Sequence, residues 1–177
     1  MKGLFFGALL LATSAFAGNV DTAKSEFKWK GTKVTGEHYG LIKVKDGNVV
    51  LKDGKIDKGN VVMDMGSIDV TDLSGEWKDK FLTHIKSGDF FEISKYPEAK
   101  LEIKGIKGDK IQGVLEIKGK KGNVEIPYKK DGKTYSGKLT FDRTKFDMVY
   151  GSGDFFKNLG DKMIHNEVQV DFKVVLK

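Results

Sequence analysis

The sequence has no cysteine and only two prolines among its 177 residues. The lack of cysteine excludes a disulfide scaffold, a thiolate metal site, a cysteine nucleophile and a lipid anchor on cysteine. Glycine is frequent, with 22 residues, but it follows no three-residue period, which excludes collagen. The hydrophobic share of 39% is too high for a disordered chain with a net charge of only +6. We therefore expect one globular domain with many turns.

The N-terminal residues have the features of a secretory signal peptide, which we assign to residues 1–17. Lys2 supplies a positive start, residues 4–11 are almost wholly apolar, and Ala-Phe-Ala at 15–17 has the small-x-small pattern of a cleavage site. The apolar run is far shorter than the roughly 20 residues that a membrane helix needs. We therefore expect a mature domain at residues 18–177, periplasmic or secreted, without a stable membrane anchor.

From residue 24 onward, apolar and polar residues alternate with the period of β-strands that have one dry face. The clearest run is the last, where the apolar positions are Val168, Val170, Phe172, Val174 and Leu176. Aspartate–glycine pairs at 46–47, 53–54 and 131–132 predict tight hairpins. Seven or eight such strands predict an all-β fold, either two packed sheets or one sheet closed into a barrel.

One segment, residues 74–87, breaks this alternation. It places Trp77, Phe81, Leu82 and Ile85 at helical spacing. We expect one short α-helix here, long enough to plug one end of a barrel.

Chemistry-bearing motifs are scarce. His38, His84 and His165 are far apart, and none has a neighbour at a metal-binding spacing, so we expect no metal site. The sequence has no nucleophile elbow and no phosphate-binding loop, so we expect no catalytic residue and no cofactor. An enzyme would require two polar groups that converge in a cavity, such as His38 beside an inward carboxylate.

Lysines alternate with apolar residues along several strands, which is typical of the wet face of a sheet. A second interpretation is that their positive field attracts anionic lipid headgroups. Acidic residues are interspersed and the chain is expected to be exported, so we expect no nucleic-acid partner.

Arg143 is the only arginine in the chain. It has the parity of Leu139 and Phe141, so a regular strand would point it inward, where a guanidinium needs an acceptor. Either an inward carboxylate pairs with it, or it receives a ligand headgroup at the barrel mouth. If the strand ends at Asp142, Arg143 is merely exposed.

Several segments together resemble the YceI-like family of lipid- or polyisoprenoid-binding proteins. The strongest match is residues 84–99, HIKSGDFFEISKYPEA, supported by residues 64–68, 113–119 and 141–146. The order and spacing agree from about residue 24 to residue 176. The usual family opening places a histidine after the first strand, whereas here His38 comes later.

The resemblance implies an extended, antiparallel, eight-stranded lipocalin-like β-barrel. Its interior would hold an isoprenoid lipid or a similar long-chain amphiphile for transport, without covalent chemistry. Parity and helix placement then predict the ligand contacts, with His38 and Arg143 near the head and the tail against Phe27, Trp29, Met63, Phe81, Ile85, Leu115, Ile126, Phe141 and Phe172. The alternative is a filled, ligand-free barrel that acts as a protein-interaction or stress-protective module. A homodimer remains open as the assembly state.

Overall fold

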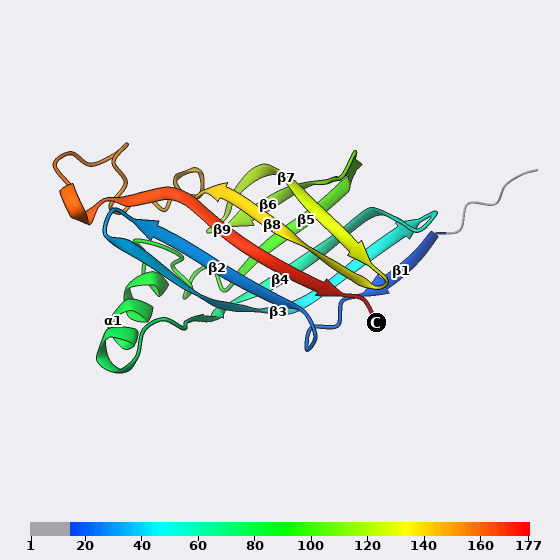
Figure 1. The fold of residues 1–177 in the computed structure, drawn as a ribbon, viewed down its shortest axis with the longest axis horizontal. Helices are drawn as coiled ribbons and strands as arrows, with labels where there is room; N and C mark the ends of the chain where they lie inside the picture. Colours follow the sequence, from blue (N-terminus) through cyan, green and yellow to red (C-terminus); the bar gives the residue numbers. More distant parts are fainter. Residues whose placement is uncertain (1–14) are drawn as a thin grey trace, which may run out of the picture.

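The computed structural model describes residues 15–177, which form a closed, eight-stranded antiparallel β-barrel with one short α-helix (Figure 1). The barrel strands are β2 (Glu26–Lys33), β3 (Gly36–Lys52), β4 (Lys55–Val70), β5 (Glu98–Lys107), β6 (Lys110–Ile117), β7 (Lys120–Asp131), β8 (Thr134–Asp142) and β9 (Ile164–Val175). The remaining elements are β1 (Ala15–Asn19), α1 (Gly75–Lys86) and the short 3-10 helices η1 (Arg143–Phe146) and η2 (Gly160–Lys162). The predicted all-β barrel is confirmed. Most of the predicted signal peptide, residues 1–14, lies outside the described residues.

The sheet closes because the long strand β3 has partners on both sides. Its first part pairs with β2, from Lys33↔Gly36 to Phe27↔Ile42, and most of its length pairs with β4. The other neighbours follow in the order β2-β9-β8-β7-β6-β5-β4. The short strand β1 continues the row of β2 along the far end of β3, where Gly18 pairs with Val49. The alternation of dry and wet residues therefore becomes an inside and an outside.

Two of the three predicted aspartate–glycine hairpins are confirmed. Asp53 and Gly54 connect β3 to β4 with φ angles of 51° and 74°, and Gly132 lies between β7 and β8 with a φ of 55°. The third prediction is wrong, since Asp46 and Gly47 lie inside β3. The register with β4 shifts just before this pair, between Val44 and Asp46, and the Asp46 carboxylate accepts from the Gly47 N–H, so the pair lies beside a strand irregularity and not in a turn.

The predicted helix is present as α1, with Ser74 and Ser87 at its two caps. Ile85 is buried, and Phe81 and Leu82 pack against the core, but Trp77 is 73% exposed. Figure 1 shows α1 at one end of the barrel, beside the β2–β3 hairpin and the segment between η1 and β9. No helix within residues 15–177 has the length and apolar character needed to cross a membrane.

The ladder between β7 and β8 is short. It runs only from Asp131↔Thr134 to Tyr128↔Gly137, after which the two strands diverge. The 3-10 helix η1 covers the resulting gap and contributes the buried Phe146, which meets Phe141 edge-on at 5.5 Å between ring centroids. Phe146 therefore closes this side of the barrel wall.

Candidate ligand-binding cavity

The end of the barrel next to α1 encloses a cavity of about 570 Å³. Its walls are mostly apolar and come from seven barrel strands, from α1 and from the segments that follow α1 and η1. The apolar lining residues are Phe27, Trp29, Ile42, Met63, Met65, Phe81, Ile85, Phe90, Phe91, Ala99, Leu101, Leu115, Ile117, Leu139, Phe141, Met148, Tyr150, Ile164, Val168 and Val170. A volume between about 300 and 1,000 Å³ with this kind of lining is typical of sites for small apolar molecules.

The polar lining residues gather at one end of this cavity. The β2–β3 hairpin contributes Lys33 and Glu37, α1 contributes His84, and the segment before β9 contributes Asp161 and Lys162. These three elements lie at the same end of the barrel in Figure 1. The cavity thus has an apolar interior and a polar mouth, the pattern that suits an amphiphilic molecule.

Most residues predicted from the sequence as ligand contacts lie on this cavity. Nine of the eleven line it, namely Phe27, Trp29, His38, Met63, Phe81, Ile85, Leu115, Phe141 and Arg143. The sequence therefore selected side chains that the fold brings together from seven different elements.

The other two predicted contacts, Ile126 and Phe172, do not line the cavity. Ile126 is 1% exposed in the packed core, and the Phe172 ring stacks on Phe27 with 6.1 Å between centroids. The Phe172 ring also covers Gly137, where an added Cβ would lie 2.8 Å from the ring. Both residues pack in or against the core, but neither borders the cavity.

Several lining residues were not predicted. Leu101, Leu139 and Val170 share the inward parity of neighbours that were chosen, so the alternation contained them. Met148 and Tyr150 lie in an irregular segment after η1, where no periodicity marks the inward side chains.

Arg143 is 3% exposed, although β8 ends at Asp142. The predicted ion pair with an inward carboxylate is wrong. The guanidinium instead donates to three backbone carbonyls, those of Met148 (2.6 Å), Ile164 (3.0 Å) and His165 (3.0 Å). Burial lowers the pKa of this guanidinium, with the Asp142 carboxylate acting in the opposite direction. Arg143 therefore ties the segment after η1 to the start of β9.

His38 lies beside a carboxylate, the kind of pair that the enzyme hypothesis named. Its Nδ1 lies 2.7 Å from Oδ2 of Asp72, whose other oxygen accepts from the Tyr39 N–H at 2.9 Å. Burial opposes the charge on Asp72, but the Tyr39 N–H and the His38 imidazole outweigh it and hold the pKa of this carboxyl below its ordinary value.

All three histidines line the cavity, but each has a different partner. His84 lies 3.1 Å from an Asp89 oxygen, and His165 lies 2.8 Å from the Thr32 hydroxyl. Within residues 15–177, no group of three or more histidine and carboxylate side chains is arranged to hold a metal ion.

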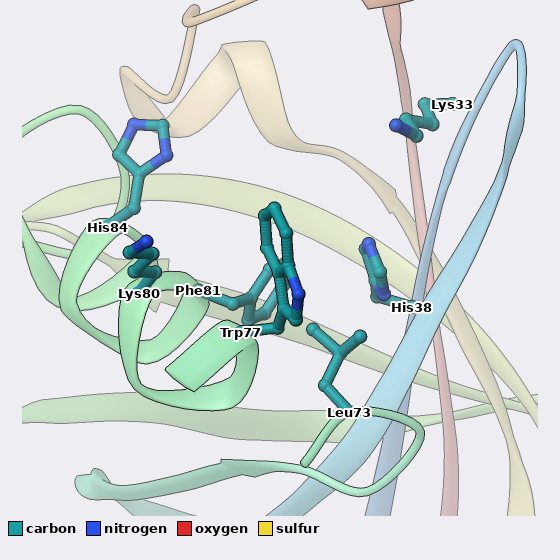
Figure 2. Close-up of a pocket in the computed structure, with 7 residues that line it drawn as sticks. All are labelled: Lys33, His38, Leu73, Trp77, Lys80, Phe81 and His84. Carbon is teal, nitrogen blue, oxygen red and sulfur yellow. The ribbon is translucent and has the colours of Figure 1, made fainter. Parts of the chain in front are cut away.

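A second, open groove of about 360 Å³ lies outside the mouth, between α1 and the β2–β3 hairpin. Figure 2 shows the side chains around it, which are Lys33, His38, Leu73, Trp77, Lys80, Phe81 and His84. Four of these, including His38 and Phe81, also line the main cavity, so the groove and the cavity are adjacent.

Comparison with known proteins gives one family and several similar folds. The sequence model of a family described as YceI-like domain matches residues 19–176. No protein with a curated description matches the chain.

Among solved structures, BcnA of Burkholderia cenocepacia superposes with a TM-score of 0.64 at 24% identity, covering 89% of this chain and 99% of BcnA. A polyisoprenoid binding domain from Saccharophagus degradans gives a TM-score of 0.63 at 12% identity, covering 90% of this chain and 97% of that domain. The YCEI protein of Campylobacter jejuni gives 0.50 at 16% identity, covering 70% and 74%. At these identities the superpositions establish a shared fold.

Proposed function

The chain belongs to the YceI-like family, and from this premise we propose that it is an exported carrier that sequesters an isoprenoid lipid or a similar long-chain amphiphile. The tail occupies the apolar interior of the barrel and the head stays at the polar mouth. No covalent chemistry is involved. The relative from Saccharophagus degradans, described as a polyisoprenoid binding domain, supports this class of ligand.

The observation that carries the proposal is the cavity of about 570 Å³ with its apolar wall. Burying ten methylenes of a tail contributes roughly 8 kcal/mol, at about 0.8 kcal/mol each. Several kcal/mol of lost translational and rotational freedom oppose this gain. Affinity then depends mainly on tail length, and the aromatic and methionine side chains of the wall can adapt to an irregular tail.

A ligand-free barrel would instead need its aromatic side chains packed against one another throughout. Such packing is present in part of the barrel, where Phe172 stacks on Phe27 and Tyr128 on Tyr135. By contrast, Phe90, Phe91 and Phe141 line the open cavity. This contrast favours the carrier over the filled module.

At the mouth, we assign the head region to His38 and not to Arg143. Three of the five N–H groups of an arginine are already used by backbone carbonyls at Arg143. The His38 ring lies at the junction of the cavity and the outer groove.

Export is supported by the start of the described chain. Residues 15–17 are exposed, including Phe16 at 63%, whereas Gly18 and Val20 are buried. Cleavage after Ala17 would therefore remove no buried side chain, although it would shorten β1, where residues 15–17 pair with β3.

The test is organic extraction of the folded protein after purification from its own host without detergent. We expect mass spectrometry of the extract to show one dominant long-chain lipid in near-stoichiometric amount. A lipid-free extract from a well-folded sample contradicts the carrier role.

A further inference from the structure

The three hairpins at the end of the barrel opposite α1 are rich in lysine. Their tips are residues 52–58 between β3 and β4, residues 104–110 between β5 and β6, and residues 129–133 between β7 and β8. Figure 1 shows these hairpins at one end of the barrel and α1 at the other. Together the tips hold nine lysines and four aspartates, a net charge of +5, and all of these side chains are exposed. We call this surface the basic end.

The basic end carries the whole net charge of the expected mature domain. Outside the three tips, residues 18–177 have as many acidic as basic side chains. The cavity mouth, for example, has the carboxylates of Glu37 and Asp161 beside the ammonium groups of Lys33 and Lys162. The molecule therefore has one positive end and a remainder without net charge, and the field of the positive end attracts anions.

The three tips form one continuous surface. The Lys130 ammonium donates to the Gly54 carbonyl at 2.7 Å, which joins the β7–β8 tip to the β3–β4 tip. The Tyr128 N–H donates to the Asp109 carbonyl at 3.3 Å, which joins the start of the β7–β8 tip to the β5–β6 tip. Lysines that are up to about eighty positions apart in sequence thus share one end of the molecule.

Most ammonium groups of the basic end have no carboxylate beside them. Lys104 pairs with Glu102, and the Lys110 ammonium lies 3.7 Å from a Glu125 oxygen. The other seven lysines make no ion pair with any residue in the range 15–177. An anionic surface can therefore approach them without breaking an internal ion pair.

The composition of the basic end selects the kind of partner. Its cations are all lysines, whereas nucleic-acid sites add bidentate arginines or aromatic side chains that stack on bases. None of the large hydrophobic side chains exposed within residues 15–177 belongs to the tips, whereas a protein partner would need aromatic or arginine anchors. Lysine is a flexible point charge that needs no fixed geometry, which suits a fluid surface of anionic lipid headgroups.

We propose that the basic end docks the protein on a bilayer rich in anionic lipids, with the cavity mouth directed away from that bilayer. The attraction is electrostatic and acts within a Debye length, about 8 Å at physiological ionic strength. Because the tips expose no large apolar side chain that could insert, docking is reversible and stays at the level of the headgroups. The inference does not depend on the proposed carrier function, since no residue of the tips lines either cavity.

The test is sedimentation of the mature protein with vesicles of phosphatidylcholine alone or with about one third phosphatidylglycerol. We expect binding to the anionic vesicles to be at least about tenfold tighter, and to weaken steeply as the salt concentration rises. Equal binding to both kinds of vesicle, or binding to neither, overturns the proposal.

The variant Lys55→Gln/Lys58→Gln/Lys107→Gln/Lys133→Gln removes four charges, with at least one from each tip. Each lysine close to an anionic surface strengthens binding by about fivefold, so the variant should bind anionic vesicles at least about a hundredfold more weakly. All four positions are exposed, so the fold should tolerate the change.

The charge-matched control is Lys43→Gln/Lys95→Gln/Lys145→Gln/Lys157→Gln, four exposed lysines outside the tips and outside both cavities. Its net charge falls by the same amount, but its affinity for anionic vesicles should fall by about fivefold or less. Equal losses in the two variants would show that net charge, and not the basic end, causes binding, and the proposal would be wrong.

The orientation can be measured at Trp77, which is 73% exposed on α1 at the opposite end of the barrel. The variant Trp29→Phe leaves it as the only tryptophan. Anionic vesicles whose lipid tails carry bromine should bind this variant without quenching its emission. Strong quenching would place the mouth against the bilayer and contradict the proposed orientation.

Double-stranded DNA provides the last arm. If the protein binds DNA more tightly than anionic vesicles, and through the same four lysines of the tips, the basic end is a nucleic-acid site and the proposal is wrong. Weaker binding to DNA than to the vesicles supports the bilayer as the partner.

Discussion

The ring of Phe81 on α1 lies parallel to the indole of Trp29 on β2, with an interplanar angle of 2°. The Trp29 Nε1 in turn donates to the Asp69 carbonyl at 3.0 Å. This stack joins the helix to the barrel wall and separates the cavity from the outer groove.

Phe81→Ala should therefore speed the release of a bound lipid. The substitution opens the wall at the mouth and lowers the free energy of unfolding by about 2 kcal/mol, less than for a fully buried phenylalanine. Stopped-flow transfer of a fluorescent lipid to acceptor vesicles measures the release. The control is Leu82→Ala, half-buried on the same helix but in neither cavity. Equal release rates in the two variants would contradict the role of Phe81.

Phe141→Asp should abolish lipid uptake. A carboxylate at this lining position would lie against the apolar tail, and burying it there costs more than the tail gains. Leu41→Asp, at an exposed position on the outer face of β3, should bind lipid normally. Fluorescent-lipid titration of both folded variants measures the difference. Normal uptake by Phe141→Asp would place the tail elsewhere.

Phe172→Ala should lengthen the tail that the barrel accepts, because Phe172 packs against the lining residue Phe27 and its loss would extend the cavity into the core. In the wild type, affinity for a series of straight-chain alcohols should rise about fourfold per methylene until the tail fills the cavity. The variant should continue this rise for further methylenes. Val174→Ala, one inward position lower on β9, is the control and should keep the wild-type limit. An unchanged limit in Phe172→Ala would show that Phe172 does not limit the length of the tail.

Stability should depend on pH through Asp72. The pKa of this carboxyl is lowered in the folded protein, so the native state favours its charged form. This contribution is present above the ordinary value of 3.8 and is lost as the pH falls through the lower folded value. Chemical denaturation should therefore find Asp72→Asn less stable than the wild type at pH 7, with a smaller difference at pH 3. A difference that does not change with pH would exclude this linkage.

Arg143→Lys should lower the free energy of unfolding by about 2 kcal/mol, because an ammonium cannot reach the three carbonyls that the planar guanidinium serves. The adjacent and exposed Lys145→Gln is the control and should change stability little. Thermal unfolding of both variants measures this effect. A neutral Arg143→Lys would mean that the three hydrogen bonds do not hold the segment after η1.

The alternation of residues predicted the barrel because each strand has one dry face and no other element is large enough to cover it. It also selected the inward side chains, but it could not give their height along the barrel axis. Height depends on strand tilt and register, and parity alone could not show that Ile126 and Phe172 lie outside the cavity lining. The alternation alone cannot separate an inward side chain that lines the cavity from one that packs in the core.

The local sequence pattern also failed to predict the surroundings of side chains whose partners are distant in sequence. Trp77 fits the helical stripe, yet α1 lies at the end of the barrel and touches it along a narrow line. Arg143 was expected to need an acceptor, with an inward carboxylate as one alternative, but η1 turns the chain so that the carbonyls of Ile164 and His165 come within reach. Because every residue has a backbone carbonyl, the sequence does not indicate which carbonyls accept these hydrogen bonds.

Native mass spectrometry of the mature protein, purified from its host without detergent, tests the central claim most directly. The account predicts a species heavier than the polypeptide by the mass of one lipid, and loss of this extra mass in Phe141→Asp. A wild-type protein that is folded, carries only its polypeptide mass and takes up no farnesyl phosphate or farnesol would contradict it.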